Sequence, residues 1–261
     1  MPDRVATYFY CLLQARRAPR LGRAGRGLPH TGRPRLLDAG QGLWLVVGDA
    51  PLGHYSGERI ERKLSDLEWI SACAMAHERV IEDAARSGTV IPMKLFTLFA
   101  SDERALVHIS RARRKLDKLL KRVADRHEWG VRLTLDENRA RRGPNARARR
   151  QATGLGTGTS FLVRKQQERQ AARRLVAEAR AAAERVYVEL SRHADESRRQ
   201  TPAQADGRIR VLLDAAFLVR SRGAERFRAA ARAAGRRLDG RGLALVLSGP
   251  WPPYTFVAEP A

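Results

Sequence analysis

Apolar and polar positions recur along this chain with two periods, one typical of strands and the other of helices. Runs rich in β-branched, aromatic and leucine residues predict strands, and apolar residues spaced three and four apart predict helices. The predicted strands are 5–13, 42–47, 89–99, 129–135, 209–219 and 243–247, and the predicted helices are 58–86, 101–123, 160–193 and 224–234. Pro92 inside the third strand predicts an edge position or a bulge, because proline has no amide hydrogen for a sheet ladder. This mixture of elements predicts an α+β fold.

The order of these elements predicts two domains. Four strands and two helices suggest a modified ferredoxin-like sandwich over residues 1–135. Within it, residues 14–40 are rich in Arg, Gly and Pro and predict a flexible loop. The charged residues 136–158 predict a linker. Residues 159–261 then form a smaller C-terminal α+β domain in which the long helix covers a sheet.

Proline and aromatic residues alternate after the last predicted strand. Prolines at 250, 252 and 253 fix three φ angles and remove three backbone donors, which stiffens the segment that carries Trp251, Tyr254 and Phe256. One interpretation is a strap whose rings pack back over the core. The other is a docking element for a partner, and a strap that leaves one ring exposed satisfies both.

The formal net charge of +22 among 261 residues suggests nucleic acid, an acidic protein or an anionic membrane as a partner. The alternative is that arginine serves as the general solvated residue, since glutamates alternate with arginines along helix 160–193. We favour this solvated surface, with weak binding of polyanions. No apolar run reaches the roughly 18 residues of a membrane helix, and the two cysteines have no metal or redox spacing. We therefore expect a cytoplasmic protein that does not bind membranes.

Three motifs resemble reactive sites only in part. His77 and Glu78 begin an H-E-x-x-H pattern, but Ile81 occupies the position of the second histidine, which favours a structural histidine. The glycines of residues 154–158 lack the preceding strand and the following Lys-Ser/Thr of a phosphate loop. Ser248-Gly249 lacks the nucleophile elbow. The sequence thus predicts no enzyme, no catalytic residues, no metal and no cofactor.

A set of segments in a fixed order resembles the gas vesicle protein F/L family. The most specific of them is Ser-Gly-Pro-Trp-Pro-Pro-Tyr-x-Phe at 248–256. The others are Thr-Tyr-Phe-Tyr at 7–10, His-Glu at 77–78, Thr-Val-Ile-Pro-Met-Lys at 89–94, Glu-Trp-Gly-Val at 128–131, Thr-Ser-Phe-Leu-Val-Arg at 159–164 and Asp-Ala-Ala-Phe-Leu-Val at 214–219. Two positions depart from the family pattern: Phe96 stands where glycine is usual, and Asp214 where asparagine is usual.

The resemblance implies an accessory protein for gas vesicle nucleation and assembly. Its implied partners are the major shell protein, which is small and hydrophobic, and other gas vesicle accessory proteins. Two groups of residues are the candidate partner-binding sites, an aromatic group and a sheet edge: Trp251, Tyr254, Phe256, Pro92 and Met93. The alternative is a basic nucleic-acid-binding module on a ferredoxin-like sheet, although no predicted strand has the aromatic signature of RNA-recognition domains, so no specific nucleic acid is expected.

Overall fold

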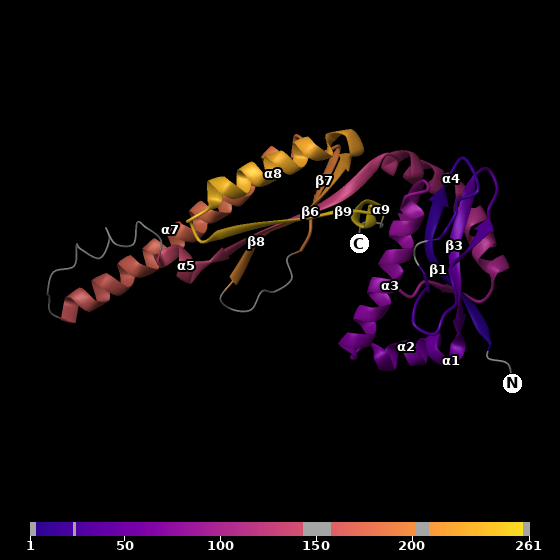
Figure 1. The fold of residues 1–261 in the computed structure, drawn as a ribbon. Helices are drawn as coiled ribbons and strands as arrows, with labels where there is room; N and C mark the ends of the chain where they lie inside the picture. Colours follow the sequence, from indigo (N-terminus) through magenta and orange to yellow (C-terminus); the bar gives the residue numbers. More distant parts are fainter. Residues whose placement is uncertain (1–3, 23–24, 143–157, 202–208, 258–261) are drawn as a thin grey trace. The chain divides into compact units, whose positions relative to one another are not determined.

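The computed structural model describes residues 4–22, 25–142, 158–201 and 209–257, and the chain divides into two compact units. Unit 1 comprises Met1–Arg126 together with Trp251–Ala261, and unit 2 comprises His127–Pro250 (Figure 1). Each unit contains one antiparallel sheet and packed helices. The predicted α+β class is confirmed.

Unit 1 is built around strand β1, which pairs with three other strands. Its sheet has the order β2-β3-β1-β4, and β5 also pairs with β1. The strands are β1 (Val5–Gln14), β2 (Arg35–Asp38), β3 (Leu43–Pro51), β4 (Thr89–Pro92) and β5 (Leu98–Phe99). The helices are α1 (Leu52–Tyr55), α2 (Gly57–Lys63), α3 (Leu67–Ala85), α4 (Asp102–Val123) and α9 (Tyr254–Val257).

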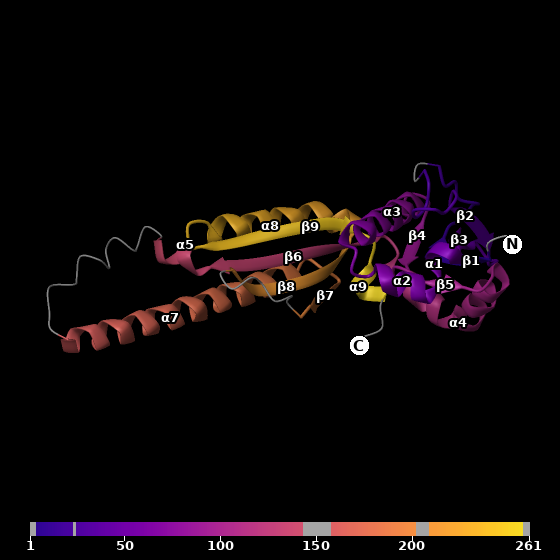
Figure 2. The ribbon, with the colours of Figure 1, turned by 90° about the horizontal axis from the view of Figure 1, so that it is seen from below.

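A bulge in β1 divides its side chains between two cores. The register with β3 shifts between Phe9 and Cys11, so that the extra residue places Tyr10 and Cys11 on the same face. That face packs against α3, whereas Phe9 and Leu12 pack against α4 on the other face. Figures 1 and 2 show α3 and α4 on opposite sides of β1 and β3. Unit 1 is therefore a three-layer arrangement with the sheet in the middle.

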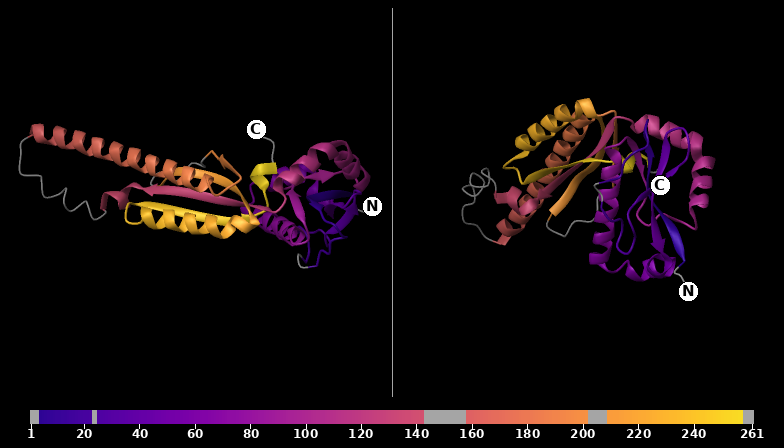
Figure 3. Two further views of the ribbon diagram at one scale, coloured as in Figure 1. Left: turned by 90° about the horizontal axis from the view of Figure 1, so that it is seen from above. Right: turned by 45° about the vertical axis from the view of Figure 1, so that its right-hand side comes forward.

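Unit 2 has the strand order of a ferredoxin-like fold. Its strands are β6 (Arg126–Asp136), β7 (Glu196–Arg199), β8 (Ile209–Arg220) and β9 (Leu243–Trp251), and its helices are α5 (Glu137–Arg142), α7 (Gly158–Ser191), the 3₁₀ turn η1 (Ser221–Gly223) and α8 (Ala224–Leu238). The sheet order is β7-β8-β6-β9. With α7 after β6 and α8 after β8, this is a β-α-β-β-α-β arrangement. Helices α7 and α8 share one core on one face of the sheet (Figure 3).

The location of the ferredoxin-like arrangement differs from the sequence interpretation. The strand predicted at 129–135 was assigned to the N-terminal domain, but as β6 it lies between β8 and β9 in the sheet of unit 2. The last residues of the chain, from Trp251, belong to unit 1 rather than to the C-terminal domain. Periodicity shows that a strand has one buried face, but it does not identify the sheet in which the strand pairs.

Several predicted elements also need local correction. The supposed flexible loop at 14–40 contains strand β2, and its Leu28 is buried with its amide donating to the Tyr10 hydroxyl at 3.0 Å. The strand predicted at 89–99 is two short strands, β4 and β5, and β4 is an edge strand as Pro92 suggested. The helix predicted at 58–86, for which the sequence allowed a break, is divided into α2 and α3, and β7 is a strand that the pattern did not predict. Residues 143–157 of the predicted linker lie outside the described residues.

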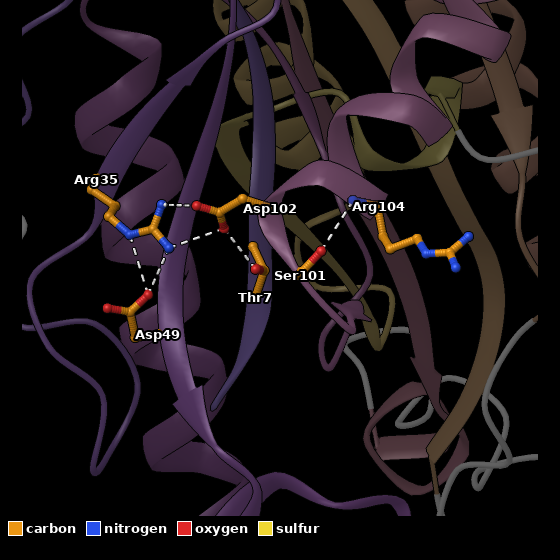
Figure 4. A network of polar contacts seen from close by, with 6 residues as sticks. All are labelled: Thr7, Arg35, Asp49, Ser101, Asp102 and Arg104. Carbon is orange, nitrogen blue, oxygen red and sulfur yellow. Dashed lines mark hydrogen bonds and ion pairs between the residues drawn. The ribbon is translucent and has the colours of Figure 1, made fainter. Parts of the chain in front are cut away.

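A polar network joins three strands of unit 1 to the start of α4 (Figure 4). The Arg35 guanidinium donates to Asp102 Oδ2 at 2.7 Å and to Asp49 Oδ1 at 2.7 Å, and the Thr7 hydroxyl donates to Asp102 Oδ1 at 2.7 Å. These residues come from β2, β3, β1 and the first turn of α4. The hydrogen bonds from Arg35 lower the pKa of the Asp102 carboxyl. Asp102 therefore anchors α4 to the sheet as a charged group, where it also complements the helix dipole.

Replacing Asp102 by Asn should lower the free energy of unfolding by about 1 kcal/mol, because charge-assisted hydrogen bonds at a partly exposed site are lost. Urea denaturation at pH 7 measures this change. Asp49→Asn is the matched control and should have a smaller effect, since the Asp49 side chain is 59% exposed compared with 29% for Asp102.

The difference between wild type and Asp102→Asn should also depend on pH. A carboxyl whose pKa is lowered by folding stabilises the protein above its ordinary pKa of 3.8, and this stabilisation is lost as the pH falls through the lowered value. The two proteins should therefore converge in stability under strongly acidic conditions. Equal losses for Asp102→Asn and Asp49→Asn at pH 7 would contradict the anchoring role.

Candidate functional site

Four of the segments that carry the family resemblance meet in the core of unit 1. They are 7–10 on β1, 77–78 on α3, 89–94 around β4 and 254–256 on α9. Tyr8, Tyr10 and His77 form one ring cluster, with ring centroids 4.6 to 5.7 Å apart. These segments are distant in sequence, so the residues that match the family pattern belong to one tertiary cluster.

Hydrogen bonds determine the state of His77 at the centre of this cluster. Its Nε2 lies 3.1 Å from the Met93 carbonyl, which can only accept, so Nε2 carries the hydrogen. Nδ1 then accepts from the Tyr8 hydroxyl at 2.8 Å, and that hydroxyl accepts from the Phe96 amide at 3.2 Å. Burial lowers the pKa of His77 to about 4, so the imidazole is neutral. Both nitrogens are engaged, which agrees with a structural histidine rather than a metal ligand.

Phe96 has a left-handed backbone, with a φ of 64°. Such a conformation costs little for glycine and more for other residues, which explains the glycine that the family pattern usually has here. In this chain the ring of Phe96 stacks on Trp69, with centroids 5.3 Å apart and an interplanar angle of 8°. The stacking provides a packing contact that a glycine lacks.

The C-terminal tail packs over the β4 edge of the unit 1 sheet. Phe256 is fully buried, and α9 contacts both β4 and α4. The Tyr254 hydroxyl donates to Glu78 Oε2 at 2.5 Å. Pro92 is buried and Met93 is half-buried in the same region, so four of the five predicted partner-binding residues lie together. The fifth, Trp251, is 40% exposed at the end of β9.

The carboxyl group of Glu78 is partly buried from solvent. Burial raises its pKa, while the hydrogen bond from Tyr254 acts in the opposite direction. Its second oxygen, Oε1, is buried and has no hydrogen-bond partner among the residues that the structure describes. Burial, and then Glu78 itself, raise the pKa of Tyr254. The tyrosine is thus a donor that keeps the tail attached to α3.

The other resemblance segments that the structure describes meet in unit 2. A side chain at Gly130 on β6 would approach the Ser248 hydroxyl on β9 to 2.6 Å, which explains the small residue at this strand contact. Trp129 and Phe217 lie in the core with Phe227 of α8. Trp129 also lines a pocket of about 380 Å³ beside α8, a feature that sequence reasoning did not find.

Asp214 forms an ion pair that accounts for its departure from the family pattern. Arg132 on the neighbouring strand β6 donates to Asp214 Oδ2 through two nitrogens, at 2.7 and 3.1 Å. An asparagine could accept these bonds, but it would not neutralise the arginine.

Comparison with known proteins identifies the family. The family described as "Gas vesicle synthesis protein GvpL/GvpF" matches residues 6–258. The chain belongs to this family. It is 29% identical over 232 residues to gas vesicle protein L of Streptomyces sp. (strain CB03234), covering 85% of this chain and 82% of that protein.

Crystal structures of two GvpF proteins share the fold. The GvpF structure from Anabaena sp. PCC7120 has a TM-score of 0.67 at 18% identity and covers 98% of both chains. The GvpF structure from Microcystis aeruginosa has a TM-score of 0.66 at 17% identity, covering 97% of this chain and 99% of that one. These similarities extend the α+β assignment over nearly the whole length. GvpL/GvpF proteins are gas vesicle structural or accessory proteins and are not a known enzyme family.

The described part of the chain adds two observations on chemistry. It contains no group of three or more His, Cys, Asp or Glu residues placed to hold a metal ion. None of its helices is both long and apolar enough to span a bilayer. Exposed apolar side chains on a surface mark a candidate binding site.

The outer face of α3 is a surface of this kind. Leu67 is 77% exposed and Met75 is 66% exposed, and Ala74 lies exposed between them. These positions share one helix face with Ser71 and Glu78, because they are three and four residues apart. The side chains of Leu67, Ser71, Ala74 and Met75 are exposed. We call Leu67, Ser71, Ala74 and Met75 the α3 apolar face.

Removing the Tyr254 hydroxyl should loosen the tail. Tyr254→Phe leaves a buried carboxyl oxygen without its donor and should lower the free energy of unfolding by about 1 to 3 kcal/mol. Glu78→Gln keeps an acceptor for Tyr254 and removes the buried charge, so its stability at pH 7 should equal or exceed that of wild type. Thermal and urea denaturation measure both variants. A larger loss for Glu78→Gln than for Tyr254→Phe would contradict this account of the tail.

The neutral His77 should make stability depend on pH. Since its folded pKa lies below the ordinary 6.5, the unfolded chain binds this proton first, and stability falls as the pH drops from 6.5 towards 4. The loss should reach at most about 3 kcal/mol, because one pKa unit corresponds to about 1.4 kcal/mol. Urea titrations near pH 7 and pH 4.5 measure it.

His77→Gln should reduce this dependence. Both proteins should carry Glu78→Gln, because the raised pKa of Glu78 contributes a change of the opposite sign in the same pH range. His108→Gln on the exposed side of α4 is the matched control. An unchanged pH slope in His77→Gln would contradict the neutral state assigned to His77.

Proposed function

We propose that this protein supports gas vesicle nucleation and assembly by binding the small hydrophobic shell protein through the α3 apolar face. The single observation that carries the proposal is the exposure of Leu67 and Met75 on a helix whose opposite side is firmly packed. A subunit that must present an apolar face to gas would aggregate in water unless a partner surface covers that face. An exposed helix face of aliphatic side chains offers such a cover.

The tail residues have different parts in this proposal. Tyr254, Phe256 and Pro92 hold the tail and the β4 edge together, and Met93 packs beside them. Trp251, with two-fifths of its surface exposed, is the ring of this segment that is available for an apolar contact. The protein acts by binding alone, in the cytoplasm at growing gas vesicles, together with other gas vesicle accessory proteins and without a cofactor.

A base-stacking function on the ferredoxin-like sheet receives no support from the geometry. RNA-recognition sheets stack bases on aromatic rings that project from their open face. In unit 2 the rings of β6 and β8, Trp129 and Phe217, project into the core with α7 and α8. No specific nucleic acid is therefore part of the proposal.

Polar substitutions on the α3 apolar face should weaken binding of the shell protein. In the double variant Leu67→Asn and Met75→Asn, two exposed apolar contacts are lost, each worth about 1.5 kcal/mol when buried by a partner. Co-purification of the shell protein with the tagged variant should fall at least about tenfold, since 1.4 kcal/mol corresponds to a factor of ten. Trp251→Ala should weaken it further.

The matched control is Val188→Asn with Val246→Asn, two exposed valines of unit 2. This pair should retain wild-type co-purification. The thermal midpoints of all variants should stay close to that of wild type, because the changed side chains are exposed. Wild-type capture by the Leu67 and Met75 variant would overturn the proposal. A large fall in its thermal midpoint would also count against the proposal, because it would show that the α3 apolar face is part of the protein's own interior.

A further inference from the structure

One face of α4 carries a continuous row of exposed basic residues. Five exposed residues, Arg104, Arg111, Arg114, Lys118 and Lys121, lie within about 100° around the helix axis, given about 100° per residue. They extend over about 26 Å at 1.5 Å per residue. We call these five residues the α4 basic face.

The α4 basic face has no compensating acids along its length. The acidic residues of α4 are Asp102 and Glu103 in the first turn and Asp117 on the flank, where Asp117 pairs with Arg113 at 3.0 Å. Asp102 is engaged by Arg35. Within the described ranges, none of the five basic side chains forms an ion pair. Such a separation of charge differs from a mixed solvated surface.

Unit 2 shows what the mixed arrangement looks like. Arg199 pairs with Glu184 of α7, and Arg237 of α8 pairs with Glu189 of α7. Arg228 pairs with Glu225 within α8. Several arginines of unit 2 thus pair with acids, whereas the five residues of the α4 basic face form no ion pair in the described structure.

The α4 basic face also lowers the stability of its own helix. Arg111 and Arg114, Arg114 and Lys118, and Lys118 and Lys121 are like-charged pairs three or four residues apart. Such pairs destabilise a helix, because the like charges face each other. A partner that brings negative charge would relieve this repulsion.

We propose that the α4 basic face binds an acidic amphipathic helix of another protein. In such a helix, acidic side chains three and four residues apart would lie on one face. They would match the five cations, which lie in a row along the axis of α4. Val107 lies in the middle of the α4 basic face and is 45% exposed, so it offers a nonpolar contact to such a helix. Phosphates of a nucleic acid would match the cations but not Val107, and the only ring on α4 is His108. The α4 basic face is therefore better suited to protein than to nucleic acid.

This surface is separate from the one in the proposed function. Helices α3 and α4 cover opposite faces of the unit 1 sheet (Figures 1 and 2). One unit can thus bind an apolar partner on one side and an acidic partner on the other. Failure of shell-protein binding at α3 would leave the α4 proposal standing, and the reverse also holds.

A labelled synthetic peptide is the probe, with glutamates at helical spacings on one face and leucines between them. Fluorescence anisotropy measures its binding to the full chain at physiological salt, where the Debye length is about 8 Å. The test variant is Arg111→Glu, Arg114→Glu and Lys118→Glu. The matched control is Arg173→Glu, Arg174→Glu and Arg180→Glu on the exposed side of α7, which changes the net charge equally.

The α4 variant should bind the peptide at least about tenfold more weakly than the α7 variant, because short-range contacts outweigh net charge at this salt concentration. A scrambled peptide of the same composition should bind wild type more weakly than the helical peptide. Val107→Ser should weaken binding of the peptide and leave binding of a short DNA duplex unchanged. Glutamate is a good helix former, so the α4 variant should fold. A triple variant with glutamine at the same three positions should also bind the peptide more weakly, without charge reversal.

Three results would overturn the proposal. Equal losses of peptide affinity in the α4 and α7 variants would show that only the net charge matters. Tighter binding of the duplex than of the peptide, dependent on α4, would assign the surface to nucleic acid. Absence of peptide binding to wild type would show that the α4 basic face is not a binding surface for an acidic helix.

Discussion

The irregularity in β1 between Phe9 and Cys11 is the constraint on which unit 1 depends. An unbroken strand would send alternate side chains to alternate faces, but the extra residue puts Tyr10 and Cys11 on the α3 side while Phe9 and Leu12 stay on the α4 side. β1 also provides pairing edges for β3, β4 and β5. The irregularity therefore places Cys11 and Leu13 in the same core as Tyr8 and Tyr10.

The buried polar cluster links this strand to the end of the chain. Tyr8 binds His77, the adjacent Glu78 accepts from Tyr254, and the tail then covers the β4 edge. Tyr8, His77 and Tyr254 each have a hydrogen-bond partner from a distant segment, as buried polar groups require, whereas Glu78 Oε1 has none among the described residues. An exposed β4 edge would be open to pairing with other chains, so the tail also protects the sheet.

The two helices of unit 1 present different chemistry to their surroundings. On α3 the exposed Leu67, Ala74 and Met75 are aliphatic, whereas the α4 basic face is cationic. The residues that make up the formal net charge of +22 thus differ in their surroundings from one surface to another. In unit 2 several arginines pair with acids, whereas the five residues of the α4 basic face form no ion pair among the described residues. Two surfaces of unlike character allow two kinds of contact at once.

The sequence by itself determined the longer strands and helices, the α+β class and the family, because periodicity and turn residues act locally. Pro92 correctly indicated an edge strand, and Ser101 caps α4 as its spacing suggested. The tertiary structure alone decided that the strand at 129–135 pairs in unit 2, that Tyr254 returns to Glu78, and that Leu67 remains uncovered. These outcomes depend on which distant surface meets each apolar face. A pattern along the chain records that a face is apolar, while its neighbour is selected by packing among segments far apart in sequence.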